Sequence, residues 1–156
     1  MNVYLAMSRA RQAAAAELQM TMLGRGLCPV STWPLEVEAT GRASARAAMD
    51  AADRQLASAA ALFVVAYPGD DDPELFIRVG QAIELHMPIV WAAPNAVDAL
   101  RVGFRVVPSQ AGGLDMLESW KRRLSGGIGE EHARRALWVM LQADEAREAD
   151  RASASP

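Results

Sequence analysis

The stretch ALFVVA at residues 61–66 is a continuous apolar run without a charged or polar side chain. Such a run is typical of a strand at the centre of a parallel sheet, covered by helices on both faces. An alanine-rich helix is predicted before it, at residues 43–59, and a second helix after it, at residues 74–86. Between the run and the second helix lies the turn GDDDP, where Asp72 is expected to cap the helix and Pro73 to occupy its first position. The sequence around the run therefore predicts a βαβ unit.

The same alternation of strand and helix extends in both directions along the chain. The predicted strands are residues 3–6, 27–31, 61–66, 89–92 and, as an edge strand, 104–107. The predicted helices are residues 9–24, 43–59, 74–86, a short one at 97–100, and two C-terminal ones at 114–124 and 130–149. This order favours right-handed crossovers, and so a three-layer, doubly wound (Rossmann/flavodoxin-like) parallel sheet of 4–5 strands with a C-terminal helical extension.

Three segments are expected along the chain: an α/β domain at residues 1–110, C-terminal helices at 111–150, and a disordered tail at 151–156. Residues 125–127, Ser-Gly-Gly, are predicted to form a hinge between the two C-terminal helices. These helices either pack on their own domain or form a subunit interface. The apolar side chains that predict a homo-oligomer are Trp120, Leu137, Trp138 and Met140.

Composition excludes several classes of partner. The 156 residues carry 16 basic and 19 acidic side chains, a net charge of −3, which argues against binding to nucleic acid. The first residues lack the basic segment and apolar core of a signal peptide, and no apolar run approaches the roughly 18 residues that span a bilayer. The single cysteine, Cys28, is predicted to be a small buried hydrophobe. These features predict a cytoplasmic protein without membrane contact.

In open parallel sheets ligands bind beyond the carboxyl ends of the strands, so the loops that follow the predicted strands are the candidate site. After the first strand, Ser8 and Arg9 offer a hydroxyl group, helix N-terminal amides and a guanidinium group that suit a phosphate. The alternative is a simple Ser8 helix cap followed by solvated arginines. Trp33, after the second strand, either stacks on a base or covers the core.

The sequence implies no metal and no cofactor. Asp70, Asp71 and Asp72 are adjacent carboxylates, but successive turn residues point in different directions and Asp72 is explained as a helix cap. His86 and His132 each stand alone.

The order of these features resembles that of the nucleoside 2-deoxyribosyltransferase superfamily, including its nucleotide N-glycosidase relatives. The resemblance spans roughly residues 1–94 and rests on the opening VYLAMS, on Asp53 ahead of the central strand, and on ELFIRVGQA running into HMPIV. It implies a nucleoside or nucleotide ligand and, in that family, pockets completed across subunits. The predicted substrate-binding residues are Tyr4, Met7, Ser8, Arg9, Trp33, Asp53 and Arg78.

Two departures from that family pattern bear on catalysis. Arg78 stands where the family has its nucleophilic glutamate, and a guanidinium cannot attack an anomeric carbon. Glu74, one helical turn earlier, is the candidate catalytic residue; it either projects into the pocket or pairs with Arg78 at i, i+4. The other departure is Met7-Ser8-Arg9, which resembles the Ser-Ile-Arg phosphate loop of the deoxynucleotide N-glycosidases.

Two functions are consistent with the sequence. The first is a nucleoside- or nucleotide-binding protein that cleaves or transfers at the N-glycosidic bond through Glu74. The alternative is a catalytically inactive descendant that senses a nucleotide or binds a protein partner through its C-terminal helices.

Overall fold

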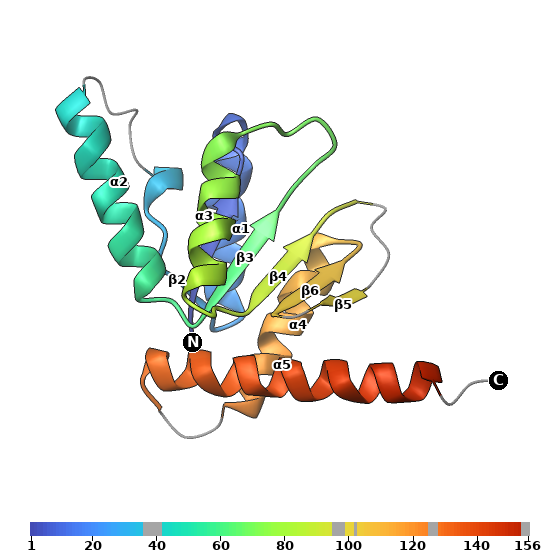
Figure 1. Cartoon of the computed structure of the whole chain (residues 1–156). Helices are drawn as coiled ribbons and strands as arrows, with labels where there is room; N and C mark the ends of the chain where they lie inside the picture. The colour runs from blue at the N-terminus through green and yellow to red at the C-terminus, as the bar shows by residue number, and fades with distance from the viewer. Residues whose placement is uncertain (36–41, 95–98, 102, 125–127, 154–156) are drawn as a thin grey trace.

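The computed structural model describes residues 1–35, 42–94, 99–101, 103–124 and 128–153, which form one six-stranded sheet with helices around it (Figure 1). The strand order is β2-β1-β3-β4-β6-β5. The strands are β1 (Asn2–Met7), β2 (Cys28–Pro29), β3 (Ala61–Val65), β4 (Ile89–Ala92), β5 (Ala99–Arg101) and β6 (Phe104–Val107). The helices are η1 (Arg9–Arg11), α1 (Gln12–Gly24), η2 (Trp33–Leu35), α2 (Arg42–Ala57), α3 (Pro73–Glu84), α4 (Gln110–Arg123) and α5 (Glu130–Ser153).

Five of the six strands are parallel, which confirms the predicted doubly wound sheet. The sixth, β5, pairs antiparallel with β6 and occupies the edge that β6 was expected to form. The prediction of a short helix at residues 97–100 is wrong for Ala99 and Leu100, which belong to β5. Residues 97 and 98 lie outside the described part of the chain. Pairing with the open edge of β6 satisfies backbone groups that a single helical turn would leave to water.

Helices cover both faces of the sheet, as the prediction of three layers requires (Figure 1). On one face α1 and α4 lie together, joined by an ion pair of 2.7 Å between Arg25 and Asp115. Gly113 of α4 sits directly on β3, because a Cβ there would be 2.5 Å from the Phe63 ring. On the other face α3 covers β1 and β3, with α2 beyond it. The central strand β3 is buried along its whole length, as predicted.

The long helix α5 crosses below the amino ends of the strands (Figure 1). Glu130 accepts a hydrogen bond from the backbone amide of Asn2 at 3.2 Å, and Arg134 Nε donates to the Ala59 carbonyl at 3.2 Å. Gly103 has a φ of +74°, and the Trp138 ring occupies the space that its Cβ would need. The C-terminal helices therefore pack on their own domain, and Trp120 and Leu137, expected at a subunit interface, are buried in the core of the same chain.

Three further expectations are corrected by the structure. Cys28 is exposed, because β2 is a two-residue edge strand and the neighbouring Leu27 takes the buried position. Residues 151–153, expected in a disordered tail, continue α5, whose backbone hydrogen bonding extends to Ser153. The Ser8 side chain makes no capping hydrogen bond, although Ser8 does precede η1. The predicted hinge at residues 125–127 lies outside the described residues.

No helix in the described ranges is long and apolar enough to cross a membrane.

Candidate functional site

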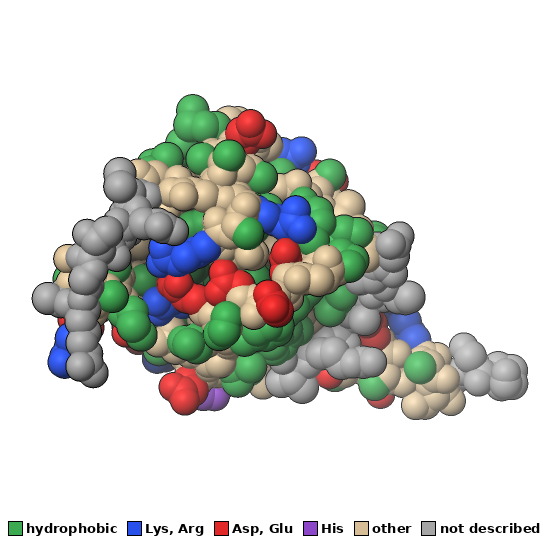
Figure 2. Space-filling view, turned by 90° about the horizontal axis from the view of Figure 1, so that it is seen from above, with side chains coloured by type: hydrophobic (Ala, Val, Ile, Leu, Met, Phe, Trp, Pro, Cys, Tyr) green, Lys and Arg blue, Asp and Glu red, His purple; other side chains and the backbone are tan. Residues whose placement is uncertain are grey.

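A small pocket lies where β1 and β3 end side by side. Met7 and Val65 are register partners, so the loops that follow the two strands meet above the sheet. From above, acidic and basic side chains gather at this place (Figure 2). The cavity has a volume of about 10 Å³, room for about one water molecule. Its lining residues are Tyr4, Ala6, Met7, Arg9, Trp33, Asp72, Glu74, Leu75 and Arg78.

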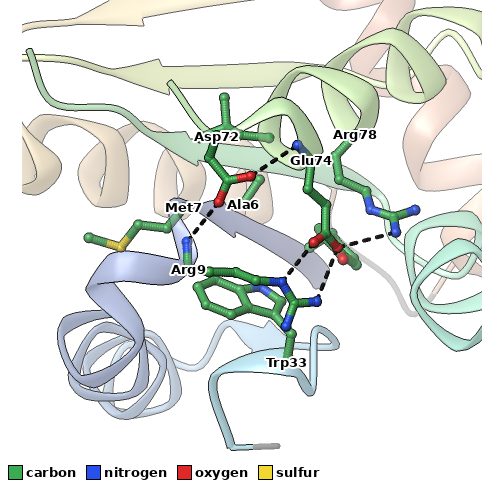
Figure 3. A pocket seen from close by; sticks show the side chains of 9 residues that line it. Ala6, Met7, Arg9, Trp33, Asp72, Glu74 and Arg78 are labelled. Atoms are coloured by element: carbon green, nitrogen blue, oxygen red, sulfur yellow. Dashed lines mark hydrogen bonds and ion pairs between the residues drawn. The ribbon is translucent and has the colours of Figure 1, made fainter. Parts of the chain in front are cut away.

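Glu74 lies between two guanidinium groups (Figure 3). Arg9 Nε donates to Glu74 Oε2 at 2.7 Å, and Arg9 Nη2 donates to Oε1 at 3.3 Å. On the other side Arg78 Nη2 lies 3.5 Å from Glu74 Oε1. The sequence left open whether Glu74 projects into the pocket or pairs with Arg78. In the structure it does both: it lines the pocket and forms an ion pair with Arg78 at i, i+4.

Asp72 joins the two loops that build the pocket. Its Oδ1 accepts the Glu74 backbone amide at 3.0 Å, which confirms the predicted cap of α3. Its Oδ2 accepts the Arg9 backbone amide at 2.9 Å, across 63 positions of sequence. One carboxylate thus fixes the start of α3 against the start of η1, and with them the backbones that carry Glu74 and Arg9.

Arg78 is a buried charge, only 2% exposed. Its Nη1 donates to Asp53 of α2 and, at 2.8 Å, to Gln81 Oε1. Its Nε and Nη2 donate no hydrogen bond to any described residue, although Nη2 takes part in the ion pair with Glu74. A guanidinium edge of two adjacent donors that lines a pocket can receive two oxygen atoms of a ligand.

The ion pair with Arg78 also changes the acidity of Asp53. Partial desolvation acts to raise the pKa of this carboxyl, but hydrogen bonds from Arg78 and Gln81 and the nearby guanidinium charges outweigh it, so the pKa is lowered. Asp53 is not among the residues that line the cavity; it adjoins the site through Arg78.

Asp53→Asn is expected to make the melting temperature depend less strongly on pH below about pH 4. Because the pKa of Asp53 is lowered by folding, its ionised form stabilises the fold above the unfolded pKa of about 3.9, and this contribution is lost as the pH falls through the folded pKa. The melting temperature of the wild type should then fall more steeply below about pH 4 than that of the variant. The effect is modest because the side chain is half exposed and screened by solvent.

Thermal scans from neutral to acid pH measure this difference. Asp50→Asn, on an exposed position of the same helix, is the matched control and should follow the wild type. Parallel profiles for all three proteins would contradict the assigned role of Asp53.

Two aromatic side chains form walls of the pocket. Tyr4 is buried, and this desolvation raises the pKa of its phenol to about 12, so the hydroxyl keeps its proton at neutral pH and remains a hydrogen-bond donor. Trp33 is also buried, and its Nε1 donates to the Leu5 carbonyl at 3.0 Å. The indole therefore covers the core and lines the pocket with the same ring.

Six of the predicted site residues meet in the pocket: Tyr4, Met7, Arg9, Trp33, Glu74 and Arg78. Ser8 is buried and does not line the cavity, so its contact with a ligand stays a prediction. Sequence reasoning missed Ala6, Asp72 and Leu75 as lining residues. Their positions at the end of β1 and the start of α3 could have indicated them, because every predicted strand end was a candidate for the site.

Tyr67 and Asp70, in the loop after β3, are engaged within the chain. Asp70 accepts hydrogen bonds from Arg11 Nε at 3.1 Å and from the Tyr67 backbone amide at 2.9 Å. The Arg11 guanidinium also lies 4.1 Å from the centre of the Tyr67 ring. Within the part of the chain that the structure describes, no three His, Cys, Asp or Glu side chains are grouped so as to hold a metal ion.

Comparison with protein-family models gives no match for this chain, and comparison with curated proteins gives none either. The resemblance to nucleoside 2-deoxyribosyltransferases therefore rests on the motifs of the sequence alone.

Proposed function

We propose that this chain binds a nucleoside or nucleotide in the strand-end pocket and acts on its N-glycosidic bond through Glu74. The observation that carries the proposal is the juxtaposition of Glu74 with the buried Arg78, whose Nε and Nη2 hydrogen-bond no described residue. A carboxylate beside two guanidinium donors suits a ligand that offers both sugar hydroxyls and oxygen acceptors. The motif resemblance supports the same ligand class.

A ligand can enter only if the pocket opens, because its present volume of about 10 Å³ holds no more than a water molecule. Arg9 is the side chain best placed to move, since 48% of it is exposed. Its guanidinium group now holds the Glu74 carboxylate through two hydrogen bonds. A phosphate group on the ligand would replace the Glu74 carboxylate as the partner of Arg9. That exchange would release one side of Glu74 towards the sugar while Arg78 continues to orient it.

The proposed chemistry is a double displacement at the anomeric carbon. A Glu74 oxygen forms a bond to this carbon as the bond to the base nitrogen breaks, and the departing base takes up a proton from solvent, which the later hydrolysis of the ester by water returns. Water then hydrolyses the glycosyl ester, which returns the carboxylate and releases the sugar. The apolar walls from Met7 and Trp33 would limit the access of water to the reacting carbon until the base has left.

A second candidate is a nucleotide sensor without turnover. The ion pairs that Glu74 forms with both Arg9 and Arg78 favour this candidate. A carboxylate held by two guanidinium groups must give up one ion pair before it can attack the anomeric carbon. Both candidates require the same ligand class, so they differ in base release and not in binding.

Arg9→Gln is expected to weaken binding of nucleoside 5′-monophosphates about tenfold while binding of the matching nucleosides changes little. The reason is that only the phosphate would replace Glu74 on the Arg9 guanidinium. Isothermal titration calorimetry with matched nucleoside and monophosphate pairs measures the difference. Arg135→Gln, which removes an exposed guanidinium from α5, is the control and should bind both ligands as the wild type does.

Failure of the wild type to bind any nucleoside or monophosphate would contradict the proposed function. An equal loss for both ligands in Arg9→Gln would contradict only the phosphate contact.

A further inference from the structure

A second cavity lies between β6, α4 and the C-terminal half of α5 (Figure 1). It shares no lining residue with the strand-end pocket. Its volume is about 300 Å³, against about 10 Å³ for the strand-end pocket, and sites for small molecules have volumes of roughly 300–1,000 Å³. In the present arrangement of the chain this second cavity is therefore large enough for a ligand.

Charged side chains surround the second cavity, and positive ones are in excess. The charged residues among its described lining are four arginines and two acidic residues: Arg105 of β6, Arg123 of α4, and Asp144, Arg147, Glu148 and Arg151 of α5. The excess of two positive charges contrasts with the net charge of −3 of the whole chain. Guanidinium groups that converge from three elements suit an anion.

Arg105 is the most informative of these arginines. Its register partner on β4 is Val90, which lies against α4, so Arg105 is on the covered face of the sheet. Such a position usually carries an apolar side chain, and only 22% of the Arg105 side chain is exposed. Arg123 and Arg151 lie in the last turns of their helices, where basic residues are favourable without a ligand. That explanation does not apply to Arg105, which comes from a strand.

The ion pairs at the second cavity can be exchanged for contacts with an anion. Arg105 Nη1 lies 3.1 Å from Glu148 Oε1. Asp144 accepts hydrogen bonds from two arginines, Arg123 at 3.3 Å and Arg147 at 3.0 Å. The carboxylates are partly exposed and can be hydrated, and exposed ion pairs contribute little to stability. An anion with two negative charges would balance the excess positive charge at this place.

The floor of the second cavity is apolar. Trp120 and Leu141 are buried and Met116 is half-buried, and all three line the cavity. An apolar group on a ligand would gain by covering these side chains, whereas a bare inorganic anion would leave them in water.

We propose that this second cavity binds a phosphate monoester with an apolar organic group. The phosphate contacts the guanidinium groups of Arg105 and Arg123, and the organic group lies over Met116 and Trp120. A phosphate monoester carries close to two negative charges at neutral pH, and its oxygens accept paired hydrogen bonds from guanidinium. The inference does not depend on the proposed function, because the two cavities are lined by different residues.

Isothermal titration calorimetry with phenyl phosphate tests this proposal. At about pH 7.5 the probe is a dianion, because the second pKa of a phosphate monoester is about 6. Phenyl sulfate has a similar shape and a single charge, so it should bind about tenfold more weakly. Inorganic phosphate should also bind more weakly than phenyl phosphate, because it lacks the ring that covers the apolar floor.

Arg105→Met should weaken the binding of phenyl phosphate about tenfold or more, because a charged donor is lost. The melting temperature of the unliganded variant should stay the same or rise, because methionine keeps the apolar part of the side chain on the covered face. Arg123→Gln should also weaken binding. Arg122→Gln, the same change at the neighbouring position, is the matched control, since Arg122 is not among the residues that line the cavity.

Arg9→Gln tells the two cavities apart, since Arg9 lines only the strand-end pocket. The proposal expects this variant to bind phenyl phosphate as the wild type does. A wild type that does not bind phenyl phosphate, equal binding of phenyl sulfate, or wild-type binding by both Arg105→Met and Arg123→Gln overturns the proposal. A wild type that binds nucleosides but not phenyl phosphate overturns this inference alone and leaves the proposed function standing.

Discussion

Arg78→Glu should lower the free energy of unfolding by about 3–5 kcal/mol, a large fraction of the stability of a domain of this size. The substitution removes the partner of Asp53 and Glu74 and places a third carboxylate beside them at a position that is 2% exposed. The new carboxylate would be buried among like charges, and the Gln81 amide, whose oxygen now accepts from Arg78, already donates its N–H to Asp53. Denaturant unfolding followed by circular dichroism measures the loss.

Two variants separate burial from charge at this position. Arg78→Met keeps most of the side-chain volume and removes the charge, so it should destabilise less than Arg78→Glu, because the partly exposed Asp53 and Glu74 can be hydrated. Arg46→Glu makes the same charge reversal at an exposed position of α2 and should change the free energy of unfolding by no more than about 0.5 kcal/mol. A fully stable Arg78→Glu protein would mean that Arg78 does not join α2 to α3 as described.

Because of these contacts, replacing Arg78 by the glutamate of the family pattern is not expected to restore the family's nucleophile. A glutamate at this position would match the family pattern, but here the guanidinium holds two helices together and supplies the donors of the pocket. Replacing it removes the surroundings in which a glutamate nucleophile would work. The glycosidic-bond chemistry that we propose for this site is therefore assigned to Glu74, which lines the cavity in the present arrangement.

The strands of the sheet were predictable because their signal is local. Apolar runs such as residues 61–66 and 89–92 have no alternative to burial, and the helices between them fix parallel pairing. The exceptions are the short edge strands. Two residues in β2 and three in β5 are too few to show a periodicity. The exposure of Cys28 and the strand at Ala99 therefore depend on neighbouring strands that the local sequence does not reveal.

The site was predictable as a place and only partly as a set of contacts. The end-of-strand rule located the loops, and helical spacing predicted the Glu74–Arg78 pair. The contact of Arg9 with Glu74 spans 65 positions and depends on the β1–β3 register, which no local pattern encodes. The burial of Arg78 was equally hidden, since an arginine in a surface helix is usually solvated.

Glu74→Gln should abolish base release from a 2′-deoxynucleoside monophosphate, with a fall in rate of about 1000-fold or more, while the ligand still raises the melting temperature. Glutamine keeps the size and the acceptor oxygen of glutamate but cannot form a glycosyl ester, so the chemical step is lost and much of ground-state binding remains. Chromatography of released base and thermal-shift assays on the same samples separate the two effects. Glu84→Gln, the same change at an exposed position of α3, is the matched control and should retain the wild-type rate. Unchanged base release in Glu74→Gln would remove Glu74 from the mechanism, whereas ligand binding by a wild type that releases no base would select the sensor.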